Sequence, residues 1–134
     1  MKIKILIPVY NDWQSVSKLI DEINDLSKNL ESQISIIIIN DASTHDHIIE
    51  NKDLENISSL KIINMKKNRG HARCIAAGLK FIFEKEEFDY VIPMDGDGED
   101  RPEEISYFLN QIKNSKDKPI VGERIKRSEG LMFQ

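Results

Sequence analysis

Short apolar runs recur along the chain and are separated by longer stretches in which apolar and polar residues alternate. The apolar runs span residues 3–9, 34–39, 60–65, 89–94 and 119–122. Each has the length of a strand rather than of a helix. The run at 34–39 (ISIIII) is apolar on both faces, which is typical of a strand that is covered on both sides in a parallel sheet. The pattern therefore predicts five strands.

The stretches between these runs show helical periodicity. Apolar residues recur at helical spacing over 13–30, 72–83 and 105–112. Asn11 or Asp12 is placed to cap the first helix. Pro102 is expected at the first position of the third helix. The acidic residues Glu103 and Glu104 that follow would be stabilised by the positive end of that helix. Residues 43–59 are more polar, and we expect a short helix with loops there.

Alternating strands and helices predict the fold class. Such an order implies right-handed crossovers and an α/β domain, with a mostly parallel, Rossmann-like sheet and helices on both faces. The 134 residues form one domain, 1–134, and the 40% hydrophobic and 31% charged fractions are those of an ordinary globular chain. The opening run MKIKILIPVYND is short and soon polar, so it predicts a buried strand rather than a signal peptide.

Charge and cysteine content narrow the function classes. A net charge of −4 argues against a nucleic-acid partner, because such proteins usually carry a basic face. Cys74 is the only cysteine, so the chain has no internal disulfide, and no cysteine-based metal site is expected. Both observations fit a cytoplasmic protein.

Polar residues follow four of the predicted strands. In an open parallel sheet, ligands bind beyond the carboxyl ends of the strands, because loop amides and helix N-termini converge there. A loop rich in Asn and Asp is the simpler explanation for any one strand, but four at one edge favour a binding cleft. The residues concerned are Tyr10, Asn11, Asp12, Asn40, Asp41, Ser43, Asn68, Arg69, Gly70, Asp95 and Asp97.

The segment DGDGED at 95–100 is the most acidic of these ends. An EF-hand calcium loop starting at Asp95 would need glycine at its sixth position and glutamate at its twelfth, where Asp100 and Ser106 stand. That reading therefore fails. Asp95 and Asp97, on a turn made pliable by glycines, could instead hold Mg²⁺ or Mn²⁺ whose other ligands are phosphate oxygens and water. A plain solvated turn is the alternative.

Three further polar groups have competing interpretations. Arg73 could reach a donor phosphate from the first turn of its helix, or could be a surface arginine. His71 is expected to be a capping or solvated group. The segment His45–Asp46–His47 lacks a third strong ligand, so we expect no metal there.

Four segments taken together resemble glycosyltransferase family 2, whose members have the GT-A fold and use nucleotide-diphospho-sugars. The segments are IPVYND at 7–12, NDAS at 40–43, NRG at 68–70 with AAGL at 76–79, and DGD at 95–97. Residues 121–127, VGERIKR, look most like the polyprenyl-phosphate branch, which includes dolichol-phosphate mannose synthases.

The resemblance implies a nucleotide pocket on the first two strands. Pro8 and Tyr10 would help form it, with Asp12 in the place of the family's usual glutamate. Asp41 would accept a hydrogen bond from the base, which is usually uracil or guanine. The implied donor is a UDP-sugar or a GDP-sugar.

The same resemblance assigns the phosphate and metal side. Asn68 and Gly70 would bring backbone and a helix N-terminus near the donor, where Arg73 would also lie. Asp95 would face the ribose or the water shell of the metal, and Asp97 would bind the metal directly, with Mg²⁺ or Mn²⁺ as the cofactor. Transfer would be metal-dependent, with inversion at the sugar. The implied acceptor, polyprenyl phosphate, would bring a cytoplasmic protein to the membrane face.

Two substitutions and the chain length depart from the family pattern. Asn40 replaces the first of two usual aspartates, and Pro93 removes an amide late in a strand. The acceptor-binding half and the catalytic base of the family follow the point where this sequence stops. We therefore expect the N-terminal, nucleotide-binding half only, with Glu99 and Asp100 as candidate bases by default and the catalytic residue unknown.

One alternative stays open, and two others fit the sequence poorly. The chain could bind a nucleotide without turnover, as a truncated and inactive domain. A nucleotidyltransferase would usually have a glycine-rich loop where residues 8–11 read PVYN, and a phosphoacceptor domain would place its acidic residues after the first and third strands. Apolar residues at 131–133 also predict that the chain pairs with a second copy or packs on further sequence.

Overall fold

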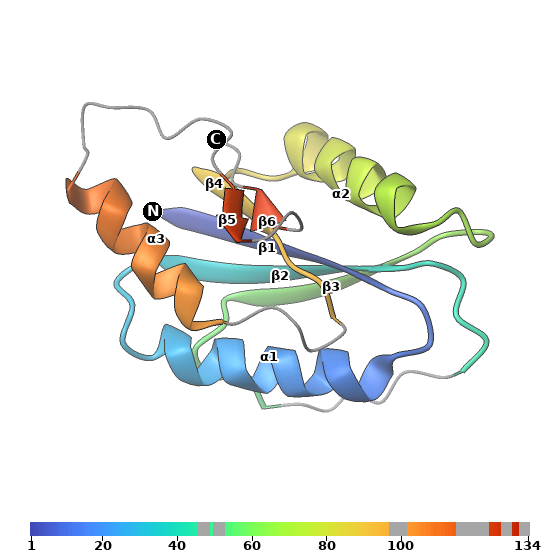
Figure 1. Ribbon diagram of the computed structural model, residues 1–134, viewed down its shortest axis with the longest axis horizontal. Helices are drawn as coiled ribbons and strands as arrows, with labels where there is room; N and C mark the ends of the chain where they lie inside the picture. Colours follow the sequence, from blue (N-terminus) through green and yellow to red (C-terminus); the bar gives the residue numbers. More distant parts are fainter. Residues whose placement is uncertain (46–48, 50–52, 97–101, 115–123, 127–129, 132–134) are drawn as a thin grey trace.

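Four parallel strands form the centre of the molecule. The computed structural model describes residues 1–45, 49, 53–96, 102–114, 124–126 and 130–131 (Figure 1). The strands stand in the order β3-β2-β1-β4. They are β1 (Lys2–Val9), β2 (Gln33–Asn40), β3 (Ser59–Asn64) and β4 (Tyr90–Pro93). A separate antiparallel pair consists of β5 (Arg124–Lys126) and β6 (Gly130–Leu131).

Helices cover both faces of the sheet. They are α1 (Trp13–Ser27), α2 (His71–Lys85) and α3 (Glu103–Asn114). Figure 1 shows α1 and α3 on one face and α2 on the other. The predicted α/β class is therefore confirmed, and so are the first four strands and the three helices.

Two hydrophobic cores follow from the alternation of side chains along the strands. Ile3, Ile5 and Ile7 of β1 pack with α1 and α3 in the larger core. Leu6 packs with Cys74 and other residues of α2 in the smaller one. Because successive side chains point to opposite faces, a strand that serves both cores must be apolar at nearly every position. The run ISIIII reflects this requirement.

The smaller core brings α2 very close to β1. A Cβ atom added at Gly78 would lie 2.3 Å from Cδ1 of Leu6, and Leu6 is completely buried. Any side chain at position 78 would therefore force either the Leu6 side chain or the helix to shift. This close approach gives a structural reason for the glycine in the AAGL segment.

Several smaller predictions can also be compared with the structure. Pro93 is the last residue of β4, and the amide of Met94 donates to the carbonyl of Leu6 at 2.9 Å, so the ladder continues past the proline. Asp12 is the N-cap of α1 but makes no side-chain capping bond. Within 43–59, the described residues 43–45, 49 and 53–59 contain turns and no helix. The predicted strand at 119–122 lies outside the described residues.

A buried charged group lies at the amino ends of the strands. Lys4 is only 9% exposed on the α2 face of β1, with its Nζ 3.3 Å from Oγ of Ser35 and 3.5 Å from the carboxylate of Glu86. Lys61 of β3 donates to both oxygens of Glu86, at 3.1 and 3.0 Å. The carboxylate of Glu86, just after α2, therefore pairs with two lysines from two strands.

These contacts set the protonation state of Glu86. Burial alone would raise its pKa, but the hydrogen bond from Lys61 and the charges of Lys4 and Lys61 outweigh burial and lower the pKa below its ordinary value of 4.5. A carboxylate with a lowered folded-state pKa stabilises the fold fully above 4.5. That stabilisation is lost as the pH falls through the folded-state value.

We predict that Glu86→Gln lowers the free energy of unfolding by about 1–3 kcal/mol at neutral pH, because it leaves the buried Lys4 without its counter-charge. The difference from the wild type should close in acid. Urea unfolding at several pH values measures it. Glu87→Gln is the matched control, because the side chain of Glu87 is 86% exposed and pairs with the surface residue Lys2. Equal losses in the two variants would contradict the buried network.

Candidate functional site

The order of the strands defines a crevice at one edge of the sheet. The chain passes from β1 through α1 to β2, and later from β3 through α2 to β4, which lies on the other side of β1. The chain therefore adds strands first on one side of β1 and later on its other side. The point where the direction reverses lies between β1 and β4. Such a switch point leaves an opening beyond the carboxyl ends of the strands, where ligands of open α/β sheets bind.

A pocket of about 270 Å³ lies at this switch point. It is lined from β1 and the following turn, from the first turns of α1 and α2, and from the end of β4. The lining residues are Pro8, Val9, Tyr10, Asp12, Val16, His71, Asp95 and Gly96. Tyr10 is 49% exposed at the pocket, whereas Val16 is fully buried. The pocket thus has an apolar floor and polar walls.

The turn after β1 is held by the loop after β2. Asn11 adopts the left-handed conformation with φ 63°, and its Oδ1 accepts hydrogen bonds from the amides of Thr44 (2.8 Å) and His45 (3.0 Å). Its own amide donates to Oγ of Ser43 at 2.9 Å. Asn tolerates this conformation better than most residues. The turn that carries Tyr10 and Asp12 into the pocket is therefore fixed through both the backbone and the side chain of Asn11.

Asp41 fixes the start of α2. Its carboxylate is 4% exposed and accepts the amides of Arg69 at 2.7 Å and Gly70 at 2.9 Å. The backbone carbonyl of Asp41 accepts a hydrogen bond from Nδ2 of Asn68 at 3.3 Å. Gly70 is the N-cap of α2 with φ 94°, a conformation that glycine adopts without strain. The loop before α2 is therefore tied to the end of β2.

The environment of Asp41 keeps it ionised. Burial alone would raise its pKa, but hydrogen bonds from the amides of Arg69 and Gly70 and from the thiol of Cys74 lower the pKa below its ordinary value of 3.8. Burial, together with the hydrogen bond to Asp41 and its charge, raises the pKa of the Cys74 thiol to about 12. Cys74 is fully buried, so it is a packing residue and not a nucleophile.

His71 and Asp95 meet inside the pocket. Nε2 of His71, the first residue of α2, shares a hydrogen bond with Oδ1 of Asp95, which follows β4. The side chain of Asp95 is 14% exposed and that of His71 is 55% exposed. The positive end of α2 thus opens toward the same pocket as the Asp95 carboxylate. The helix N-terminus suits an anion such as a phosphate, whereas the carboxylate suits a cation.

The structure divides the predicted site residues into three groups. Pro8, Tyr10, Asp12 and Asp95 line the pocket together. The second group, Asp41, Asn68 and Gly70, forms the support of α2 beside it. In the third group, Arg73 is exposed on the first turns of α2, and Asp97, with Glu99 and Asp100, lies outside the described residues. The roles of all these residues toward a ligand stay predictions.

Sequence reasoning missed four residues of the pocket, of which Val9 was placed only in the first strand. His71 was expected to be a capping or solvated group, Val16 was placed only in the helix stripe, and Gly96 was considered only for its flexibility. A Cβ at Gly96 would lie 2.4 Å from Cγ2 of Val16, so glycine is needed there for close packing under the pocket. For His71, its place directly after the glycine N-cap of α2 was the available signal.

The described pocket residues include two carboxylates, those of Asp12 and Asp95. Carboxylate oxygens are the ligands that Mg²⁺ and Mn²⁺ prefer, so the donor set fits such an ion. The described residues contain no cluster of three or more His, Cys, Asp or Glu that could hold a metal by themselves. This composition suits an ion that takes its remaining ligands from a bound phosphate and water.

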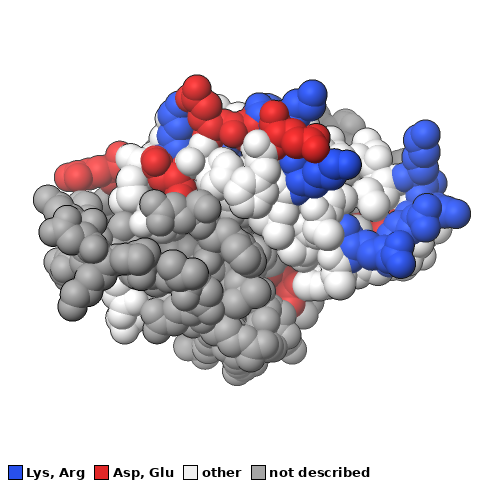
Figure 2. Space-filling model, turned by 90° about the horizontal axis from the view of Figure 1, so that it is seen from above, with Lys and Arg blue, Asp and Glu red and all other residues white. Residues whose placement is uncertain are grey.

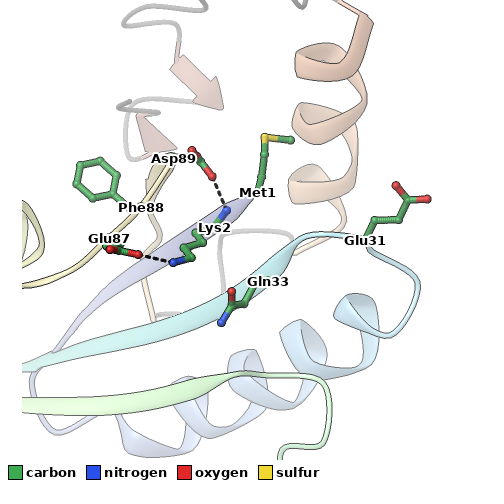
Figure 3. Close-up of a pocket in the computed structure, with 7 residues that line it drawn as sticks. All are labelled: Met1, Lys2, Glu31, Gln33, Glu87, Phe88 and Asp89. Carbon is green, nitrogen blue, oxygen red and sulfur yellow. Dashed lines mark hydrogen bonds and ion pairs between the residues drawn. The ribbon is translucent and has the colours of Figure 1, made fainter.

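A larger hollow, of about 550 Å³, lies at the opposite, amino edge of the sheet. Figure 3 shows that Lys2 meets two carboxylates there: its Nζ lies 2.5 Å from Glu87, and its amide donates to Asp89 at 2.6 Å. These groups satisfy each other, and the hollow lies away from the switch point. The smaller pocket is therefore the better candidate site.

A parallel α/β sheet with a pocket at its switch point is the architecture of many ligand-binding α/β proteins. The sequence pattern of Glycosyl transferase family 2 matches residues 4–133. The chain therefore belongs to glycosyltransferase family 2, as its four motif segments predicted. Within the described part of the chain, none of the helices combines the length and apolar composition needed to cross a bilayer.

Individual relatives place the chain near enzymes that use polyprenyl phosphates. It is 27% identical over 135 residues to the undecaprenyl-phosphate 4-deoxy-4-formamido-L-arabinose transferase of Proteus mirabilis, covering 99% of this chain and 40% of that protein. It is 25% identical over 126 residues to the dolichol-phosphate mannosyltransferase of Pyrococcus furiosus, covering 94% and 34%. The chain thus spans well under half of these relatives. The predicted similarity to the polyprenyl-phosphate branch is confirmed.

A solved structure confirms the GT-A fold. The mannosyltransferase PcManGT from Pyrobaculum calidifontis, in complex with GDP-Man and Mn²⁺, superposes with a TM-score of 0.64 at 17% identity. The match covers 93% of this chain and 35% of that one. At this identity the likeness concerns the fold.

We predict that Asp41→Asn lowers the free energy of unfolding by about 1–3 kcal/mol at neutral pH, because one of the two amides on the carboxylate loses its acceptor. The stabilisation from Asp41 is complete above pH 3.8 and is lost as the pH falls through its lowered folded-state pKa, so the two proteins should converge in acid. Urea unfolding measures both effects. Asp12→Asn, which alters a carboxylate that makes no capping bond, should leave the midpoint unchanged; a comparable loss there would contradict the assignment.

Proposed function

We propose that the chain is the donor-binding half of a glycosyltransferase that uses a nucleotide-diphospho-sugar and a divalent metal ion. The observation that carries this proposal is the pocket at the switch point, where Tyr10, Asp12 and Asp95 meet the N-terminus of α2. Membership of glycosyltransferase family 2 supports it.

The pocket residues suggest how the donor would be held. The exposed ring of Tyr10 offers a flat surface for the base or ribose, and Pro8 lines the pocket beside it. Both carboxylate oxygens of Asp41 accept hydrogen bonds from the loop before α2. Asp41 would therefore contact a base only through the remaining lone pairs of these oxygens. The N-terminus of α2 would face the diphosphate, with Arg73 in reach from its first turn.

Asp95 and Asp97 would hold the metal, with Asp95 already turned into the pocket beside His71. A bound Mg²⁺ or Mn²⁺ would neutralise the charge that develops on the departing diphosphate. The residues of this chain would orient the donor so that its anomeric carbon faces the acceptor. Attack from the opposite side of the sugar ring by an acceptor oxygen would then give inversion, with the acceptor proton taken by a base beyond the described residues.

The relatives suggest the acceptor. Both transferases named above act on a polyprenyl phosphate, and we propose the same acceptor class here. A phosphate oxygen of such a lipid would attack the sugar and release the nucleoside diphosphate. The protein would then work at the cytoplasmic face of a membrane.

We predict that the purified chain binds either GDP or UDP in the presence of Mn²⁺ and binds it at least about tenfold more weakly without the metal. Asp95→Asn should weaken metal-dependent binding about tenfold to a hundredfold, because a hydrogen bond to a charged group contributes about 1.5–3 kcal/mol. Isothermal titration calorimetry with each nucleotide measures this.

The matched control is Asp89→Asn at the other end of β4, where the carboxylate binds the amide of Lys2. It should bind the nucleotide as the wild type does. If neither nucleotide binds, or if both variants lose nucleotide affinity equally, donor binding in this pocket is refuted.

We predict that the chain, given the matching nucleotide-sugar and a short polyprenyl phosphate, forms the glycolipid with inverted anomeric configuration, and that Asp97→Ala abolishes this transfer. Thin-layer chromatography with a labelled sugar and NMR of the product measure the two results. Donor binding without transfer would instead support the alternative of a truncated, inactive nucleotide-binding domain. That outcome would separate binding from catalysis in this chain.

A further inference from the structure

Basic residues are concentrated in one part of a chain that is acidic as a whole. Residues 56–83 contain six Lys and Arg and no Asp or Glu, so this segment carries +6 while the whole chain carries −4. The remaining 106 residues therefore carry −10. Such segregation creates a field that a net charge does not reveal.

Four of these residues form a basic rim beside the candidate site. The rim consists of Lys66, Lys67, Arg69 and Arg73, all of them exposed. The first three lie in the loop between β3 and α2, and Arg73 lies on the first turn of α2. Figure 2 shows Lys and Arg side chains gathered at the right-hand end of the molecule, where Figure 1 places this loop.

The rim is held in place by the contacts already described. The amides of Arg69 and Gly70 are bonded to the buried carboxylate of Asp41, and Gly70 caps α2. The loop is thereby anchored at the carboxyl edge of the sheet, next to the pocket. Lys61, by contrast, is engaged by Glu86 at the other edge and does not belong to the rim.

Exposed acidic residues lie toward the opposite edge. Glu84 and Glu87 lie at and just beyond the end of α2, and Asp89 precedes β4. Exposed lysines such as Lys80 and Lys85 lie among these acidic residues, so this part of the surface is mixed in charge, whereas the rim is basic. An anionic plane would attract the basic rim more strongly than the mixed surface, so it would orient the molecule with the pocket toward the plane.

We propose that the basic rim docks the protein on an anionic membrane surface, with the pocket facing the lipid headgroups. This inference rests on the proposed function, because a polyprenyl phosphate acceptor lies in such a membrane. A nucleic acid would also attract positive charge. The lipid substrates named for its relatives favour the membrane.

The test compares binding of the full chain to vesicles of phosphatidylcholine alone and to equimolar phosphatidylcholine and phosphatidylglycerol, by flotation at low and high salt. No polyprenyl phosphate is added, so the result is independent of the acceptor. We expect binding to the anionic vesicles only, decreasing as salt screens the charges. Each basic residue near an anionic surface strengthens binding about fivefold, so Lys66→Gln with Lys67→Gln should weaken it about twenty-five-fold.

The matched control is Lys18→Gln with Lys28→Gln, which changes the net charge equally on exposed residues of α1 and its C-cap, on the other face of the sheet. It should keep most of the vesicle binding. Equal losses in the two pairs, binding to neutral vesicles, or binding to duplex DNA but not to vesicles would overturn the proposal.

Nucleotide titration of the same variants separates this proposal from the proposed function. If the Lys66/Lys67 pair loses vesicle binding but still binds GDP or UDP with Mn²⁺, the rim acts in docking, as proposed. If the wild-type chain binds the nucleotide but no anionic vesicles, the docking surface is wrong and the donor site stands. Vesicle binding without nucleotide binding would instead refute the donor site.

Discussion

The buried carboxylate of Asp41 is the interaction on which the candidate site depends. It joins the end of β2 to the loop before α2 through two backbone amides, and its own amide donates to the carbonyl of Val9 at 2.8 Å. One residue therefore connects β1, β2 and α2 at the edge where the pocket lies. The pocket wall from α2, with His71 and the helix N-terminus, is positioned by this connection, and so is the basic rim.

The two edges of the sheet use charge in different ways. At the amino edge, Lys4, Lys61 and Glu86 neutralise one another within or beside the core, which contributes to stability. At the carboxyl edge, the Asp95 carboxylate and the positive end of α2 both open into a pocket. Buried charges must find partners inside the protein, whereas a binding site must leave some of its charge for a ligand.

Much of the fold was predictable because the strands obey a simple rule. A strand such as 34–39 that is apolar on both faces belongs in a covered parallel sheet, and the order of elements then set the class. The motifs also located four pocket residues correctly. The contact between His71 and Asp95 could not be predicted, because it joins residues from separate elements across the switch point. The internal bonding of Asp41 was hidden for the same reason: a sequence does not show whether a carboxylate faces a ligand or nearby amides.

The contact between Gly78 and Leu6 has a consequence for the depth of the pocket. The height of α2 above the sheet is fixed where this glycine rests on the leucine, and the N-terminus of the same rigid helix forms one wall of the site. A single methyl group at position 78 would have to displace the buried Leu6 side chain or tilt that wall. The position of the wall is thus sensitive to a missing side chain two helical turns away.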